Sequence, residues 1–292
     1  MNVSGLTDVG LVRTHNEDAY FAAALTRWRM NEVPEGIGYY LAIVADGMGG
    51  AAAGELASSL AVQHIIRVLT GDLLGFREGA PSIPTNIPGR LTDAVQEAND
   101  VIFTRALEEP SFAGMGTTVV VLLTFNGSAF WASVGDSRLY LFRQGEFRQV
   151  TEDHSYVNEL VRQGNITSEQ ARRHPKRNLI TRSVGSEDVL KVDTGSFKLS
   201  TGDLLLLCSD GLSGMVHDDQ LKSIQQEMKQ SQLTCRETVS RMVAMALEAG
   251  GTDNVSVVLL ELEEADTVQL GDLASMEKTM RMQSPPNILV AG

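Results

Sequence analysis

The sequence of 292 residues has no long apolar run, few cysteines and fewer basic than acidic residues. Its longest apolar runs, at residues 119–123 and 204–208, are far shorter than the ~20 residues that a membrane-spanning helix needs. The first residues contain no basic segment leading into an apolar one, which is the pattern of a secretory signal. We therefore expect a cytoplasmic protein without a membrane-spanning segment.

Cysteine is represented by Cys208 and Cys235 alone. Cys208 lies inside an apolar run and is expected to behave as a small buried hydrophobic residue. Cys235 begins a helical pattern and has no partner at metal-ligand spacing. A disulfide framework and a cysteine metal site are therefore not expected.

Basic residues are also few, because 24 lysines and arginines stand against 37 aspartates and glutamates, giving a formal net charge of −13. Non-specific binding of nucleic acid needs clustered positive charge, so we expect no nucleic-acid partner. The acidic excess has two interpretations. It keeps the protein in solution, or part of it binds metal cations that offset its charge. The net charge alone does not separate the two.

Strands are expected in runs and helices in pairs along the chain. The apolar pattern predicts strands within residues 1–25, 39–45, 116–150, 191–208 and 254–262. It predicts helices at residues 52–69, 90–108, 155–173, 218–229 and 234–249. This order favours an α+β fold of layered antiparallel sheets over an alternating parallel sheet. The pattern fades after residue 262, which predicts one domain at residues 1–263 and a flexible tail at 264–292.

Five aspartates lie in short turn-like segments, several of them at the ends of apolar strands: Asp18, Asp46, Asp136, Asp210 and Asp253. Taken singly, each fits an ordinary turn, because Asp-Gly and Asp-Asn are favoured turn pairs. Their shared position weakens that interpretation. If the strand ends converge, the carboxylates repel one another unless cations lie between them. Oxygen ligands of this kind suit Mg²⁺ or Mn²⁺ rather than Zn²⁺.

Six segments follow one another between residues 12 and 256: Arg-Thr-His-Asn-Glu-Asp, Val-Ala-Asp-Gly-Met-Gly-Gly, Gly-Thr-Thr, Val-Gly-Asp-Ser-Arg, Cys-Ser-Asp-Gly-Leu and Thr-Asp-Asn-Val-Ser. Together they resemble the ordered motifs of the bacterial-type protein phosphatase 2C family, the PPM class of metal-dependent protein serine/threonine phosphatases. One Asp-Gly pair is a weak signal, whereas six motifs in order are a strong one. The resemblance implies a four-layer α-β-β-α sandwich, with two central antiparallel β-sheets flanked by helix pairs. It also implies a flap subdomain at about residues 151–185.

The resemblance implies a metal-binding role for each motif aspartate. Asp46 would bridge two cations, and the backbone carbonyl of Gly47 would bind one of them. Asp210 and Asp253 would complete the protein ligands of the first cation. Asp136, together with Asp210, matches the pair that holds a third, looser cation in bacterial members.

The first motif supplies further residues by the same resemblance. Glu17 and Asp18 would bind cations through water, and Asn254 would orient the neighbouring carboxylate. Arg13 would bind the substrate phosphate through its planar guanidinium. Taken alone, Arg13 would be an exposed strand arginine, but its fixed spacing to residues 16–18 favours the phosphate role.

The activity that the resemblance implies is hydrolysis of phosphoserine and phosphothreonine in proteins. A metal-bridging hydroxide would attack phosphorus directly, with Arg13 and Asp46 as catalytic residues and two or three Mn²⁺ or Mg²⁺ ions per chain. The implied partners are phosphorylated proteins, among them a cognate Ser/Thr kinase or its targets in bacterial signalling. We expect the chain to act as a monomer.

Met48 and Ala51 depart from the family pattern, because family members carry a histidine at one or other of these places, proposed at the first as general acid. Either another group, such as a metal-bound water, protonates the leaving oxygen here, or that step is unassisted. Aryl phosphates, which leave without much protonation, are then expected to be comparatively good substrates. Two other functions stay open: a pseudoenzyme that binds phosphorylated partners without turnover, and a hydrolase of small phosphate esters.

The local charge reverses between residues 162 and 182, where one acid, Glu169, faces six basic residues: Arg162, Arg172, Arg173, Lys176, Arg177 and Arg182. A solvated helix face is one interpretation of this run. The resemblance offers another, since it places the run in the flap beside the active site, where positive charge would recruit a phosphorylated partner. The sequence leaves both open. His154 and His174 are isolated, and no chemistry is assigned to them.

Overall fold

The computed structural model describes residues 2–25, 39–73, 86–125 and 127–262. The tail expected at residues 264–292 lies outside the described residues. Within them, no helix combines the length and the apolar character needed to cross a membrane.

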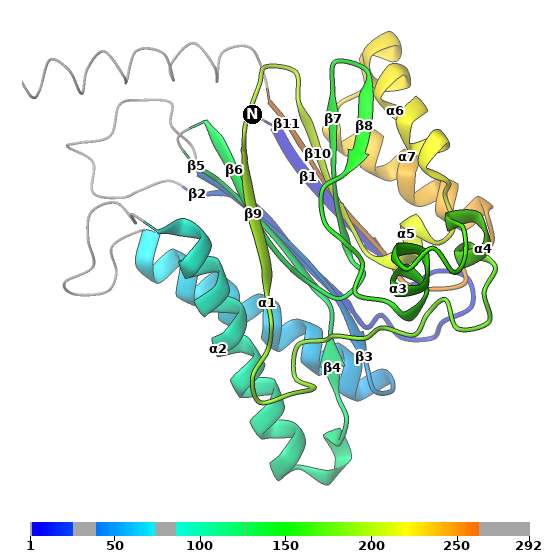
Figure 1. Ribbon diagram of the computed structural model, residues 1–292. Coiled ribbons are helices and arrows are strands. Elements are labelled where there is room, and N and C mark those ends of the chain that lie inside the picture. The colour runs from blue at the N-terminus through cyan, green and yellow to red at the C-terminus, as the bar shows by residue number, and fades with distance from the viewer. Residues whose placement is uncertain (1, 26–38, 74–85, 126, 263–292) are drawn as a thin grey trace, which may run out of the picture.

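Two antiparallel sheets form the centre of the molecule (Figure 1). The first contains, in spatial order, β1 (Asn2–Asp8), β11 (Val255–Glu261), β10 (Leu204–Cys208), β7 (Arg138–Arg143) and β8 (Glu146–Gln149). The second contains β2 (Asp18–Leu25), β3 (Tyr39–Met48), β5 (Val119–Phe125), β6 (Ser128–Val134) and β9 (Asp193–Lys198). A short strand, β4 (Gly116–Thr117), pairs with the end of β3.

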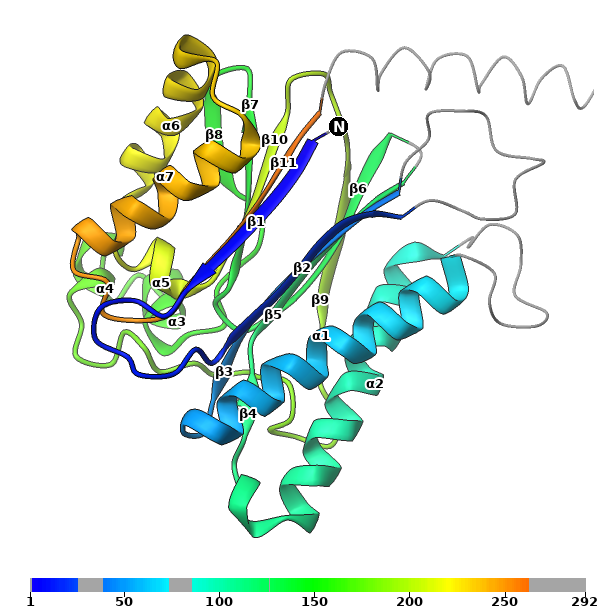
Figure 2. The same ribbon diagram turned by 180° about the vertical axis from the view of Figure 1, so that it is seen from behind.

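A pair of helices covers the outer face of each sheet, as both views show (Figures 1 and 2). The second sheet carries α1 (Ala51–Leu73) and α2 (Ile87–Glu108), and the first carries α6 (Asp218–Ser231) and α7 (Cys235–Glu248). The shorter elements are η1 (Pro110–Phe112), α3 (Tyr156–Arg162), α4 (Ser168–Arg172) and α5 (Asp210–Ser213). The predicted four-layer α-β-β-α sandwich of antiparallel sheets is confirmed.

Strand β3 explains why the central strands read as continuous apolar runs. Leu41 and Ile43 belong to the core under α1 and α2, whereas Ala42 and Val44 belong to the core between the two sheets. Successive side chains of a strand point to opposite faces, so a strand that is buried on both faces needs an apolar residue at every position. Four layers therefore give three cores, one between the sheets and one under each helix pair.

The helix predicted at residues 155–173 is instead two short helices, α3 and α4. Gly164 interrupts them, because its φ of +74° lies in the left-handed region that ends a helix. Thr167 then starts α4 with a capping box, in which it exchanges hydrogen bonds with Gln170. The apolar spacing runs through this break, which is why the sequence alone predicts one helix.

Candidate metal and active site

Asp18 and Asp46 face each other on neighbouring strands. Asp18 begins β2, and it is the direct antiparallel partner of Asp46 near the end of β3. Like charges directly opposite one another destabilise a strand pair. Burial raises the pKa of Asp18 to about 7. One of its carboxylate oxygens, Oδ1, is buried without a hydrogen-bond partner, and the other accepts a hydrogen bond of 2.8 Å from Ser209 Oγ.

Asp136, Asp210 and Asp253 reach the same place from three other segments. Asp136 lies in the turn from β6 to β7, which belong to different sheets. Asp210 directly follows Ser209 at the end of β10, and Asp253 lies just before β11. The negative charges of all three raise the pKa of Asp46. The five aspartates expected to converge therefore lie together, and we call them the aspartate cluster.

Burial and mutual repulsion both act on the cluster. Burial raises the pKa of Asp46 well above its usual value, and the charges of Asp18 and Asp210 raise it further. The pKa of Asp136 is likewise raised well above its usual value, by burial and then by the charge of Asp210. For Asp210, burial and Asp253 raise the pKa, while a hydrogen bond with Asp46 lowers it. A site of this kind favours the binding of positive charge.

The donor set of the cluster fits a divalent cation such as Mg²⁺ or Mn²⁺, because every side chain in it is a carboxylate. In the part of the chain that the structure describes, no three acidic, histidine or cysteine side chains are already grouped around one point as metal ligands. Asp253 accounts for part of this, since Arg13 and Asn254 both donate hydrogen bonds to its carboxylate. Like charges repel, so carboxylates close on a common point only around a cation.

Arg13 is fixed to the edge of the cluster by Asp253. Its NH2 group donates to Asp253 Oδ2 at 2.8 Å, and 48% of the arginine side chain is exposed. This hydrogen bond is the largest of the effects that raise the pKa of the guanidinium. Arg13 therefore combines a fixed position beside the carboxylates with N–H groups that an exposed side chain can offer to a ligand.

Asn254 holds the first motif against the last one. Its Oδ1 accepts a hydrogen bond of 2.8 Å from the Glu17 backbone, and its Nδ2 donates to the carbonyls of Val9 and His15, each at 2.9 Å. The family resemblance implies that Asn254 orients the carboxylate of Asp253. The backbone N–H of Asn254 donates to that carboxylate at 2.9 Å. Its side chain has the additional task of shaping the loop that carries Arg13 and Glu17.

Thr117 and Thr118 bind the backbone of Asp46, a task that the sequence did not reveal. Asp46 N–H donates to Thr118 Oγ1 at 3.0 Å, and Thr117 Oγ1 donates to Asp46 O at 2.9 Å. Thr118 Oγ1 also lies 2.7 Å from Ser137 Oγ, next to Asp136. The Gly-Thr-Thr segment was the available signal, but nothing in its composition says which strand it contacts.

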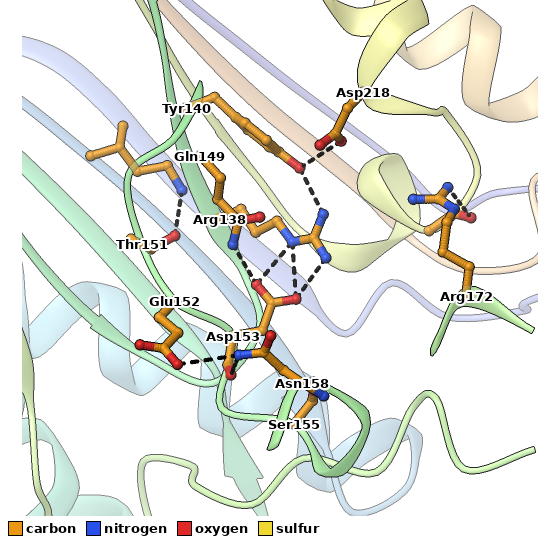
Figure 3. Close-up of polar contacts among 12 residues, drawn as sticks. Arg138, Tyr140, Gln149, Thr151, Glu152, Asp153, Ser155, Asn158, Arg172 and Asp218 are labelled. Carbon is orange, nitrogen blue, oxygen red and sulfur yellow. Dashed lines mark hydrogen bonds and ion pairs between the residues drawn. The ribbon is translucent and has the colours of Figure 1, made fainter. Parts of the chain in front are cut away.

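Arg138 is a second residue to which the sequence assigned no task. It forms a two-pronged ion pair with Asp153, from Nε at 2.9 Å and NH2 at 2.6 Å, and its NH1 donates to Tyr140 Oη at 2.7 Å (Figure 3). Its charge lowers the pKa values of Asp136 and Asp210. The ion pair joins β7 to the segment at residues 151–185, which we call the flap.

A pocket of about 580 Å³ opens beside the aspartate cluster. Asp136, Asp210 and Asp253 line it, together with α3, α4 and the segment from α5 to the start of α6. Arg138 and Asp153 also line this pocket, and Figure 3 shows their network between the flap and α6. The pocket connects the carboxylates with the flap, so a substrate bound at the cluster would also meet flap residues.

The basic residues of the flap are used in different ways. Three form ion pairs: Arg162 with Glu152, Arg173 with Glu169 and Arg182 with Asp193. Arg172 donates to the Gly214 carbonyl at 3.4 Å and lines the pocket together with Arg177. The ammonium group of Lys176 lies 5.3 Å from the ring centre of Tyr156. Part of the run is thus structural, while Arg172 and Arg177 face the pocket.

Comparison with known proteins gives one consistent family. The family model described as protein phosphatase 2C matches residues 14–248. The serine/threonine phosphatase stp of Listeria monocytogenes is 37% identical over 277 residues, covering 94% of this chain and 100% of that protein. A solved serine/threonine phosphatase of S. agalactiae is 32% identical with a TM-score of 0.76, covering 90% and 99% of the two chains.

A further solved structure is similar to this chain and contains metal. It is the catalytic domain of the serine/threonine protein phosphatase PstP in complex with two manganese ions. It has a TM-score of 0.72 and 32% identity, and the match covers 90% of this chain and 98% of that one.

Proposed function

The chain belongs to the protein phosphatase 2C family and is a bacterial-type serine/threonine protein phosphatase, and from this we propose that its phosphatase activity depends on divalent cations held by the aspartate cluster. The observation that carries the proposal is the set of charges around Asp46. Burial and the four other aspartates of the cluster all raise its pKa. Carboxylates held together against their own repulsion indicate a site for cations. The manganese in the related PstP structure supports the same proposal.

We assign the ligands as follows. Asp46 and the carbonyl of Gly47 would hold cations together with Asp210 and Asp253, and Asp136 would hold a third, looser cation with Asp210. Glu17 and Asp18 would act through bound water. Mn²⁺ or Mg²⁺ bound there would lower the pKa of a water molecule and offset charge on the phosphate oxygens. We assign all these residues to one catalytic domain at residues 1–263.

Arg13 would bind the phosphate of the substrate. It is fixed at the cluster through one N–H group, and the exposed remainder of its planar guanidinium can donate to two oxygens of a phosphate. Met48, at the end of β3, lies where some family members have a histidine. Its thioether has no proton to give to a leaving oxygen. We therefore infer that substrates with good leaving groups, such as aryl phosphates, are favoured.

The flap would recruit the phosphoprotein. Arg172 lines the pocket beside the cluster, and Arg173, the residue that directly follows α4, keeps 82% of its side chain exposed although it pairs with Glu169. Positive charge at the rim of a site attracts a phosphorylated partner. We propose that the natural substrates are phosphorylated proteins, including a Ser/Thr kinase or its targets, and that the phosphatase opposes that kinase.

The test compares hydrolysis of p-nitrophenyl phosphate and a phosphothreonine peptide by purified protein, with Mn²⁺ or with EDTA. Both should be hydrolysed with Mn²⁺, and turnover should be lost in EDTA and in Asp46→Ala. Asp93→Ala, which removes an exposed carboxylate on α2, is the matched control and should keep full activity. Folded, metal-loaded protein without turnover would point to a phospho-binding pseudoenzyme. Turnover of small esters alone would point to a small-ester hydrolase.

A further inference from the structure

His154 lies at the start of the flap and is buried, with 7% of its surface exposed. It holds Gly135, the residue before Asp136, from both sides. The Gly135 backbone N–H donates to His154 Nδ1 at 3.0 Å, and the His154 backbone N–H donates to the Gly135 carbonyl at 2.9 Å. The two polar backbone groups of Gly135 are thus bound by one residue of the flap.

The surroundings of Gly135 leave no room for a side chain. Its φ of +98° lies in the region that favours glycine, and an added Cβ would lie 2.6 Å from the Thr118 side chain. Thr118 in turn contacts Ser137, on the other side of Asp136. Asp136 is therefore held between a glycine fixed by His154 and a serine that contacts Thr118.

The contacts of the imidazole fix the role of its Nδ1 atom. A backbone N–H can only donate, so Nδ1 is the acceptor in its contact with Gly135. Nε2 lies between two groups of opposite charge, with Asp193 Oδ2 at 3.1 Å and Arg182 NH1 at 2.9 Å, and Arg182 NH1 also donates to Asp193 Oδ1 at 2.9 Å. Burial and the charge of Arg182 lower the pKa of His154, which favours a neutral ring. Asp193 lies at the start of β9, so it anchors the ring to the sheet.

The other end of the flap is fixed in the same manner to the segment beside Asp46. Val184 and Thr117 exchange backbone hydrogen bonds of 2.8 and 3.0 Å, and Thr117 also donates to the Asp46 carbonyl. Within the flap, Thr181 N–H donates to the His154 carbonyl at 2.8 Å. The start of the flap is thereby bound to the residue before Asp136, and its end to a threonine that binds the backbone of Asp46.

We propose that His154 is a positioning residue for Asp136, acting through the backbone of Gly135, and that this contact couples the flap to the site of the third cation. The inference rests on the proposed role of Asp136 as a ligand of that cation. A histidine with a merely structural role would stabilise the fold without setting the affinity of one cation site. A positioning role requires the hydrogen-bond acceptor at Nδ1, whereas a merely structural role does not, so variants that keep or remove this acceptor separate the two roles.

The experiment is a calorimetric titration of Mn²⁺ into full-length, metal-free protein, with thermal unfolding as a check of folding. Asp136→Asn should abolish the weakest Mn²⁺ site. His154→Ala should weaken that site on the order of tenfold and leave the tighter sites unchanged. His154→Asn should stay within about threefold of wild type, because its amide oxygen can take the place of Nδ1. Asp193→Asn, which leaves His154 Nδ1 unchanged, is the matched control, and its affinity for Mn²⁺ at the weakest site should also stay within about threefold of wild type.

The outcomes separate this inference from the proposed function. If Asp136→Asn weakens Mn²⁺ binding but His154→Ala does not, the positioning role is wrong and the ligand assignment stands. Equal losses in His154→Ala and His154→Asn also overturn the positioning role. If Asp136→Asn binds Mn²⁺ as wild type does, both claims are wrong. Should His154→Ala not fold, His154→Gln replaces it, because its longer chain misplaces the amide and should weaken the site.

Discussion

Replacing Asp46 by asparagine should stabilise the metal-free protein, although it removes a proposed cation ligand. The substitution keeps the shape of the side chain and takes one negative charge out of a cluster in which burial and four other aspartates raise the pKa of Asp46. Relief of an uncompensated, partly buried charge is worth about 2 kcal/mol or more in the free energy of unfolding. For a domain of this size, that corresponds to a rise in Tm of about 4–8 °C in EDTA.

With Mn²⁺ bound, the wild type should have a higher Tm than Asp46→Asn, the reverse of their order in EDTA. A ligand at a hundredfold excess over its Kd stabilises the folded state by about 2.7 kcal/mol per site, which raises Tm by about 5–11 °C. The wild type should show at least this shift, whereas Asp46→Asn should show little of it. The assay is differential scanning calorimetry of both proteins, each with EDTA and with Mn²⁺.

Asp203→Asn is the control, because Asp203 is also buried but is paired rather than repelled. Arg143 donates to its two carboxylate oxygens at 2.9 and 2.7 Å. This variant should lose stability by about 2 kcal/mol with and without Mn²⁺, and it should keep the full Mn²⁺ shift. A lower Tm for Asp46→Asn than for wild type in EDTA would refute the repulsion argument. An undiminished Mn²⁺ shift in Asp46→Asn would refute the ligand assignment.

Three further changes test the surroundings of the cluster. Gly54→Ala would place a Cβ 2.9 Å from the Cδ atom of Glu17 and 3.0 Å from the backbone carbon of Gly47, so the glutamate must move and the Gly47 backbone must give way. Mn²⁺-dependent kcat should then fall on the order of tenfold, and an unchanged kcat would argue against roles for Glu17 and the Gly47 carbonyl in the site. Replacing Arg172 and Arg173 by alanine should raise KM for a phosphoprotein roughly fivefold and leave KM for p-nitrophenyl phosphate unaffected; identical effects on both substrates would make the flap charges a solvated surface. Met48→His should raise kcat for a phosphothreonine peptide more than for an aryl phosphate, measured across pH; equal gains would argue against a missing general acid.

The apolar patterns predicted layered antiparallel sheets because such patterns are local, whereas the four-layer order was implied by the family resemblance. Every position of β10, for example, is buried, and its five apolar residues already mark a strand covered on both faces. The break between α3 and α4 escaped prediction, since Gly164 and the cap at Thr167 outweigh an apolar spacing that continues through them.

The carboxylates of the site were predictable from the motifs, but their supports were not. Asp46 and Asp210 stand in segments whose order along the chain is distinctive. His154, in contrast, contacts Gly135 and Asp193, which lie 19 and 39 residues away in sequence. No local pattern signals a contact across such separations, which is why the sequence showed only an isolated histidine.

The most direct measurement is the anomalous scattering of manganese in crystals grown with Mn²⁺. The account predicts anomalous peaks at the aspartate cluster, within bonding distance of the carboxylates of Asp46 and Asp210, in the same preparation that hydrolyses a phosphothreonine peptide. Active protein whose manganese lies elsewhere, or whose cluster binds none at saturating Mn²⁺, would contradict it.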